Sequence, residues 1–212
     1  MSASNFPSVN RIHRRADLAV HLVGLMLILG AGSVLIAQAG VRLGGTLVFA
    51  TALYALCALL SNLASIVYHF SPWHAHRTLL RRIDHAAIYP SITGTFTPFF
   101  ILADTVWTWS LLVLCWAITL GAMWLKVTSE TVKSRWSTAS YLGLGALGLC
   151  ALPDLTTVPI ATLWCIVSGA VLYVIGTVFY ARRSMPYRYA IWHMFVNFGG
   201  IAMFVGLWLS LF

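Results

Sequence analysis

The residues best suited to chemistry in this chain are a serine and a histidine one helical turn apart, Ser65 and His69, and an acid soon after them, Asp84. Histidine is a common zinc ligand, and a catalytic zinc ion usually has three protein ligands and a water molecule. His193, in the last apolar segment, could supply a second ligand. Asp84 could accept a proton or orient the water, and Ser65 could hydrogen-bond a ligand or a developing oxyanion. The pattern predicts a metal-dependent site built from separate segments.

Three further side chains could complete the ligand set, namely His21, His85 and Tyr189. His21 follows Asp17 by four residues, so the two face the same way on a helix. We interpret this as a structural pair that orients the imidazole, with His21 as an alternative third ligand.

Asp84 has a second interpretation that we weigh equally with the first. It could be a charge at a helix N-terminus, favoured by the helix dipole and paired with Arg81 or Arg82.

The elements that must position these residues are membrane helices. The chain has 212 residues, of which 60% are hydrophobic and 8% charged, and its mean hydropathy is +0.86. A soluble domain carries about a quarter charged residues, so this chain has too few to cover its own surface in water. We predict one integral membrane domain over residues 1–212. The four cysteines lie in apolar runs without a CxxC pair, which is typical of small buried side chains.

Seven apolar runs predict an all-α, seven-helix transmembrane bundle, because most approach the ~20 residues that a bilayer requires. The fifth is short and rich in glycine, so we expect it packed inside the bundle. The third contains Pro90 and Pro98, which predict either a kinked helix lining a cavity or a purely structural kink, with threonines satisfying the freed carbonyls. The predicted spans are 16–37, 44–70, 84–103, 106–125, 137–152, 159–180 and 189–211.

Basic residues alternate between the two ends of these helices. The positive-inside rule then places the N-terminus in the cytoplasm and the C-terminus on the far side, in a multi-pass protein of the cell (inner) membrane. The lipid bilayer is the expected partner, and nucleic acid is not, because the charge orients the protein. Twelve of the thirteen basic residues fall in four groups at one end, and only Arg42 lies at the other, with Asp104 and Asp154: Arg11, Arg14 and Arg15; Arg77, Arg81 and Arg82; Lys126, Lys133 and Arg135; Arg182, Arg183 and Arg188.

This topology brings six titratable side chains to one depth near the cytoplasmic leaflet, from four helices. Ionisable groups within spans are costly and tend to mark functional sites. Two polar stripes, each with a spacing of four residues, are expected to face the bundle interior. These are Ser61, Ser65 and His69 on the second helix, and Tyr189, His193 and Asn197 on the seventh. We expect Ser61 and Asn197 to be polar contacts between helices.

The chain resembles the hemolysin III family, part of the group that includes the progestin and adiponectin receptors. The resemblance rests on seven helices, Ser-x-x-x-His ending the second, Asp-His opening the third, Ile-Tyr-x-x-Ile-Thr-Gly-Thr-Phe-Thr-Pro after it, and Ile-Trp-His-x-Phe-Val on the seventh. It implies a zinc ion held by one histidine on the second helix and two on the seventh, and hydrolysis of lipid amides. His69 and His193 match two of the ligands, and Ser65 and Asp84 match the supporting pair.

This chain departs from the family pattern on the seventh helix, where Tyr189 replaces the first histidine of His-x-x-x-His. A neutral tyrosine is a poor zinc ligand. The sequence therefore favours a zinc-dependent hydrolase of a lipid-like amide with its site at the cytoplasmic leaflet, associated through the family name with hemolysis. The alternative is a non-catalytic receptor or channel-forming protein with a degenerate metal site.

Overall fold

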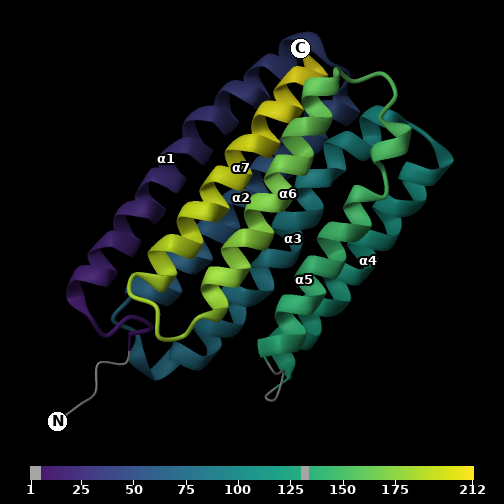
Figure 1. Ribbon diagram of the computed structural model, residues 1–212. Coiled ribbons are helices and arrows are strands. Elements are labelled where there is room, and N and C mark those ends of the chain that lie inside the picture. Colours follow the sequence, from purple (N-terminus) through teal and green to yellow (C-terminus); the bar gives the residue numbers. More distant parts are fainter. Residues whose placement is uncertain (1–5, 130–133) are drawn as a thin grey trace.

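The computed structural model describes residues 6–129 and 134–212, and over these residues the fold is an all-helical bundle of seven α-helices (Figure 1). The chain begins at one end of the bundle and finishes at the other, as the odd number of helices requires. Lys133, predicted to lie in a basic loop, falls outside the described residues. The helices are α1 (Arg11–Arg42), α2 (Gly45–Phe70), α3 (Arg77–Ala103), α4 (Val106–Thr128), α5 (Ser134–Leu149), α6 (Ile160–Ala181) and α7 (Arg188–Leu211), with short 3-10 turns η1 (His74–His76) and η2 (Leu152–Asp154).

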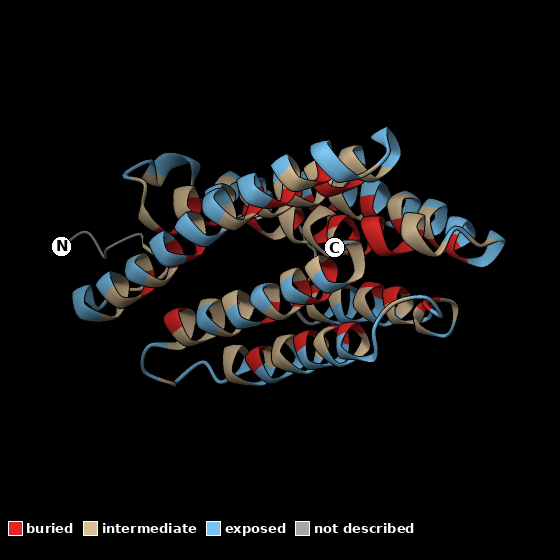
Figure 2. Ribbon diagram, turned by 90° about the horizontal axis from the view of Figure 1, so that it is seen from above, coloured by how far each residue is buried: buried red, intermediate tan, exposed pale blue. Residues whose placement is uncertain are grey.

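Six of the described helices, all except α5, are long and apolar enough to cross a membrane. In the most apolar window of α3, 50% of the residues are buried, against 22% in each of the other five. α3 packs against α2, α4 and α5, so it is the central helix of the bundle. Exposed residues lie mainly on outward faces (Figure 2), as expected for a protein whose solvent there is lipid.

α1 and α3 begin earlier than predicted. α1 starts at Arg11, where the Asn10 side chain accepts hydrogen bonds from the backbone N–H groups of Ile12 and His13. α3 starts at Arg77 instead of residue 84. Both extra segments are basic. The prediction missed them because hydropathy marks the lipid-covered part of a helix and not its polar turns beyond the bilayer.

The prediction that the fifth helix packs inside the bundle is wrong. α5 packs against α3, α4 and α6, but it leaves Trp136 and Leu142 exposed. A Cβ at Gly143 or Gly145 would meet open space, whereas one at Gly148 would lie 2.3 Å from the Phe96 ring. Only one of the three glycines is therefore needed for close packing.

α3 remains a continuous helix through Pro90 and Pro98. Proline at these positions removes the hydrogen bonds to the carbonyls four residues earlier. The threonines do not replace them as predicted, since Thr95 and Thr97 donate to the carbonyls of Ser91 and Thr93 instead.

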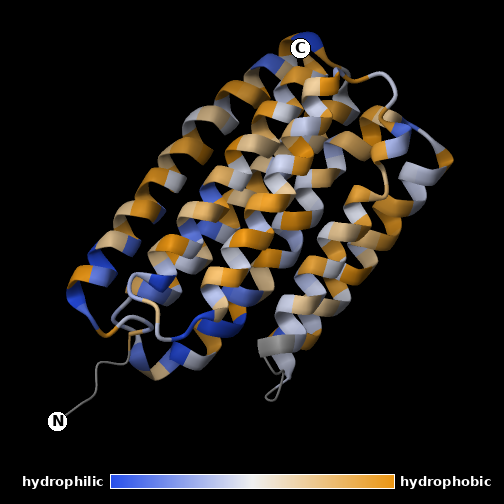
Figure 3. Ribbon diagram, viewed as in Figure 1, coloured by the Kyte–Doolittle hydropathy of each residue, from blue (hydrophilic) through white to orange (hydrophobic). Residues whose placement is uncertain are grey.

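Hydrophilic residues gather at the end of the bundle where the N-terminus lies (Figure 3). The starts of α1, α3 and α7 share this end, so their basic residues form one polar surface. This arrangement matches the predicted alternation of charge along the chain.

Candidate functional site

The site is centred on Asp17, a carboxylate on α1 that is 1% exposed. Its Oδ2 accepts a hydrogen bond of 2.7 Å from Nδ1 of His69 on α2. Its Oδ1 accepts one of 2.7 Å from Nδ1 of His193 on α7. A carboxylate only accepts, so both histidines carry a proton on Nδ1, and in the neutral ring Nε2 then keeps its free lone pair. One acid thereby joins three helices and fixes two imidazoles.

His21 is held in a similar way by the backbone. Its Nδ1 lies 2.8 Å from the carbonyl oxygen of Asp17 and 3.4 Å from Oδ1 of the same residue. Its Nε2 is 3.0 Å from Ser65 Oγ, which also lies 3.5 Å from Nε2 of His193. Because Nδ1 donates to the carbonyl, Nε2 of His21 accepts from the serine hydroxyl. Ser65 thus lies between the Nε2 atoms of two histidines.

We call Asp17, His21, Ser65, His69 and His193 the histidine cluster. The ring centroids are 4.0 Å apart for His21 and His193, 5.0 Å for His69 and His193, and 5.5 Å for His21 and His69. One ligand atom from each of Asp17, His21 and His193 lies within 4.8 Å of the others. Within the described part of the chain, this is the one group of three such side chains close enough to share a metal ion.

Asp84 and His85 form a separate pair on α3. The Asp84 Oδ2 atom is 3.2 Å from His85 Nδ1, an electrostatic contact without hydrogen-bond geometry. Since α3 begins at Arg77, Asp84 is two turns inside the helix, and its interpretation as an N-terminal charge is wrong. Among the described residues, its ion-pair partner is His85, with no pairing to Arg81 or Arg82.

Tyr189 lies beside the histidine cluster. Its ring meets that of His69 edge to face, with centroids 4.9 Å apart and planes at 87°. The guanidinium of Arg188 lies over the Tyr189 ring, 4.5 Å from its centroid. Tyr189 therefore packs against a site histidine at the position where the family pattern has a ligand.

A family model described as "Haemolysin-III related" matches residues 14–204, which is nearly the whole chain. The chain belongs to the hemolysin III family. It is 32% identical over 192 residues to a protein named "Hemolysin-3 homolog" from Bacillus subtilis (strain 168), covering 89% of this chain and 90% of the relative. It is 29% identical over 194 residues to "Hemolysin-3" from Bacillus cereus, covering 89% and 87% of the two chains.

The two polar stripes predicted for this hemolysin III protein do meet, and Asp17 of α1 joins them. Ser65 and His69 on α2 contact His193 and Tyr189 on α7. Asn197, expected to link helices, donates from Nδ2 to the Val20 carbonyl of α1 over 2.9 Å.

A tight polar layer lies one turn deeper than the cluster. A Cβ at Gly24 would be 2.6 Å from Asn197 Oδ1 and 3.0 Å from Asn62 Nδ2. A glycine at this position lets two asparagines approach α1, which brings α2 and α7 close enough for their histidines to share Asp17.

The spacing of four residues indicated Asp17 only as a local partner of His21, and not as a residue that binds histidines of α2 and α7. A signal was available, because Asp17 and Asp84 are acids that fall within spanning helices, whereas Asp104 and Asp154 lie at helix ends or in connections. An acid inside a span needs a partner in the bundle.

Proposed function

We propose that this hemolysin III protein is a zinc-dependent hydrolase of a lipid-like amide, with its site at the cytoplasmic leaflet of the cell membrane. The observation that carries the proposal is the histidine cluster itself, three imidazoles and a carboxylate from three helices with a serine hydroxyl between two ring nitrogens. Buried polar side chains in a membrane are costly, so such a concentration favours function over packing.

The chemistry of the donors fits zinc. Imidazole nitrogen and carboxylate oxygen are its usual protein ligands, and catalytic sites use three of them. His21, His193 and Asp17 are the residues that would hold the ion, with His69 supporting Asp17 by its hydrogen bond. When bound, zinc would act as a Lewis acid and lower the pKa of a water molecule to about 7.

Side chains of the protein would orient the ligands, stabilise the developing charge and accept a proton. Asp17 orients His69 and His193 and keeps their Nε2 atoms available. Ser65 would donate a hydrogen bond from its hydroxyl group to the oxygen on which negative charge develops. Asp84 would accept a proton, as a carboxylate on the neighbouring α3. The surrounding lipid would exclude bulk water and select an apolar substrate.

The zinc content of the purified full chain tests the metal site. After dialysis against buffered zinc, we expect inductively coupled plasma mass spectrometry to find about one zinc ion per chain. His193→Ala and His21→Ala should lose it, since each removes a proposed ligand. His85→Ala is the matched control, because that histidine lies at the same end of the bundle but pairs with Asp84. A wild-type protein without zinc, or His193→Ala with full zinc, would overturn the metal site.

Turnover tests the reaction separately. Wild-type protein in mixed micelles should release fatty acid from an N-acyl lipid, and Ser65→Ala should reduce kcat by about 10²-fold, the usual effect of an oxyanion donor. Equal rates in the two proteins would exclude this role of Ser65.

The second candidate is a non-catalytic receptor or channel-forming protein, favoured by Tyr189 packed against His69 in place of a ligand. It predicts a protein that folds normally but hydrolyses no lipid amide. Under this alternative, Tyr189→His restores the family pattern and increases zinc affinity. Under the first candidate the wild-type chain already turns over substrate, and this variant is not needed for activity.

A further inference from the structure

A cleft of about 360 Å³ opens beside the histidine cluster, at the N-terminal end of the bundle. Arg11, Arg14 and Arg15 line it from α1, together with Leu18. These four follow the spacing of one helix face, with three or four residues between neighbouring turns. The other walls are Phe70 at the end of α2, and Phe6 from the segment before α1. The lining of the cleft therefore combines three basic side chains with three apolar ones.

Among the described residues, no carboxylate forms an ion pair with the arginines of the cleft. The ion pairs of the described residues all join a histidine to Asp17 or Asp84, and both acids are buried. Asp104 and Asp154 lie at the opposite end of the bundle. Three guanidinium groups on one helix face, with no described acid paired to them, are suited to bind an anion.

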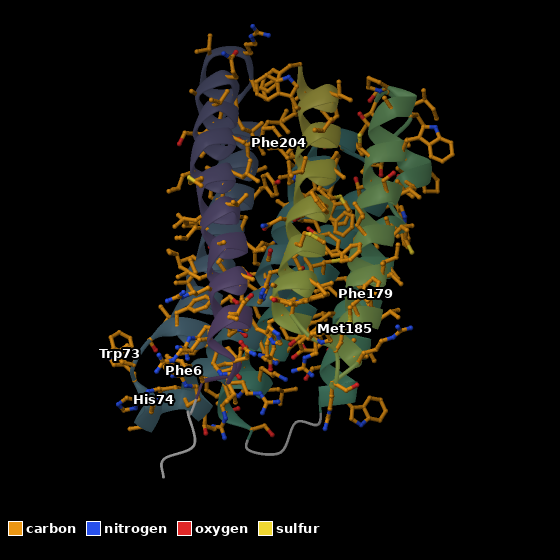
Figure 4. All side chains as sticks on the ribbon, turned by 60° about the vertical axis from the view of Figure 1, so that its left-hand side comes forward. Phe6, Trp73, His74, Phe179, Met185 and Phe204 are labelled. Atoms are coloured by element: carbon orange, nitrogen blue, oxygen red, sulfur yellow. The ribbon has the colours of Figure 1, made fainter. Side chains whose placement is uncertain are left out.

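The cleft is held in shape by Phe6. The Arg14 guanidinium lies 4.2 Å from the centroid of the Phe6 ring, and the ring meets His74 edge to face at 4.7 Å. Figure 4 shows Phe6 and His74 together at this end of the molecule. Arg77 fixes His74 in turn, with a distance of 3.0 Å between its Nη2 and the His74 Nδ1. The cation–π contact therefore orients one of the three arginines before any ligand binds.

The helix face that carries the arginines continues as an apolar surface toward the middle of the membrane. Leu22, Met26 and Leu29 follow Leu18 on the same face, and they are 45%, 64% and 49% exposed. A molecule bound along this face would meet positive charge at its head and hydrocarbon along its length. A free inorganic anion would use only the first part of this surface.

We propose that the cleft binds the phosphate of an anionic phospholipid through Arg11, Arg14 and Arg15, with an acyl chain lying along α1 over Leu22, Met26 and Leu29. The cleft is separated from the histidine cluster by one side chain, because the ring centroid of Phe70, which lines the cleft, lies 5.3 Å from that of His21 and 5.8 Å from that of His69. The bound lipid is thus a neighbour of the cluster, and its binding requires neither zinc nor turnover.

Native mass spectrometry of the full chain released from detergent tests the proposal. The probes are phosphatidylglycerol, phosphatidylcholine with the same chains, short-chain phosphatidylglycerol, and inorganic phosphate. We expect the long-chain phosphatidylglycerol to bind about tenfold more tightly than phosphatidylcholine with the same chains, because the arginines attract its anionic head group. The triple variant Arg11→Gln/Arg14→Gln/Arg15→Gln should lose this preference. The short-chain lipid should bind more weakly than the long-chain one.

The matched control is Arg81→Gln/Arg82→Gln/Arg182→Gln, which removes the same charge from the same end of the bundle but lines no part of this cleft. It should keep the preference within about twofold, a difference of ~0.4 kcal/mol. A triple cleft variant that still prefers phosphatidylglycerol, or a control that loses the preference equally, would overturn the proposal. Displacement of the lipid by inorganic phosphate, together with equal binding of short and long chains, would assign the cleft to a free anion and also overturn it.

Discussion

Asp17 and Asp84 are both buried acids near the same end of the bundle, yet their surroundings differ. Both oxygens of Asp17 accept hydrogen bonds from histidines on other helices, α2 and α7. Asp84 contacts the histidine that follows it in the sequence. One acid therefore joins three helices, whereas the ion pair of the other stays within a single helix.

The difference shows what a buried charge needs in a membrane. An acid whose two oxygens accept hydrogen bonds of 2.7 Å from side chains on other helices stabilises the packing of those helices. An acid with a local partner contributes less to packing between helices, so it is freer to take part in chemistry. Asp17 is accordingly the structural centre of the site, and Asp84 remains the proposed proton acceptor.

Replacement of Asp17 should have the largest effect on this comparison. Asp17→Ala leaves the Nδ1–H groups of His69 and His193 without their acceptor and should lower the free energy of unfolding by about 3–5 kcal/mol, as for breaking a buried pair. Asp84→Ala should cost only about 1 kcal/mol, the value for one modest polar contact. Unfolding in mixed micelles with increasing dodecyl sulfate measures both. Equal losses in the two variants would contradict the distinction.

A substitution at Gly24 should have the next largest effect, because it pushes apart the helices that share Asp17. Gly24→Ala places a Cβ 2.6 Å from Asn197 Oδ1, and such overpacking costs about 1–3 kcal/mol. Gly30→Ala, on the same helix, meets open space and should be neutral or stabilising by up to about 1 kcal/mol. Thermal unfolding of the two variants in one detergent compares them. If both shift the midpoint alike, close packing at Gly24 is not important.

Ser65 should give the smallest effect on stability. Ser65→Ala removes the hydroxyl that bonds His21 Nε2 at 3.0 Å, for an expected loss of about 1 kcal/mol. Ser61→Ala, one turn away on α2, is the control and should change stability by less than about 0.5 kcal/mol. The same thermal measurement resolves this difference. A larger loss at Ser61 than at Ser65 would mean that the cluster adds nothing to the packing of α2.

Most of the fold could be predicted from hydropathy and charge. The run predicted over 44–70 corresponds to α2, Gly45–Phe70, because its apolar residues end where the chain leaves the lipid. The beginning of α3 could not be predicted in the same way, since Arg77–Ile83 carries three arginines and lies outside the long apolar run, yet it is helical. This segment is helical because it continues the buried part of α3, and no long apolar run indicates it in the sequence.

Part of the candidate site could also be predicted. Ser65, His69 and His193 were expected to converge, and the three lie together. Asp17 was not expected at the centre, because the spacing of residues gives the face of a helix but not the helices that this face meets. That depends on the approach of α2 and α7 to α1, which small residues such as Gly24 allow.

The hydrogen bond between Asp17 and His193 joins residues 176 positions apart, on the first and last helices. During biosynthesis α1 enters the membrane first, so Asp17 has no partner from α7 until nearly the whole chain has been made. The cluster is completed only when the last helix inserts beside the first. A chain that stops before α7 therefore retains in α1 a buried carboxylate oxygen that lacks its hydrogen-bond donor.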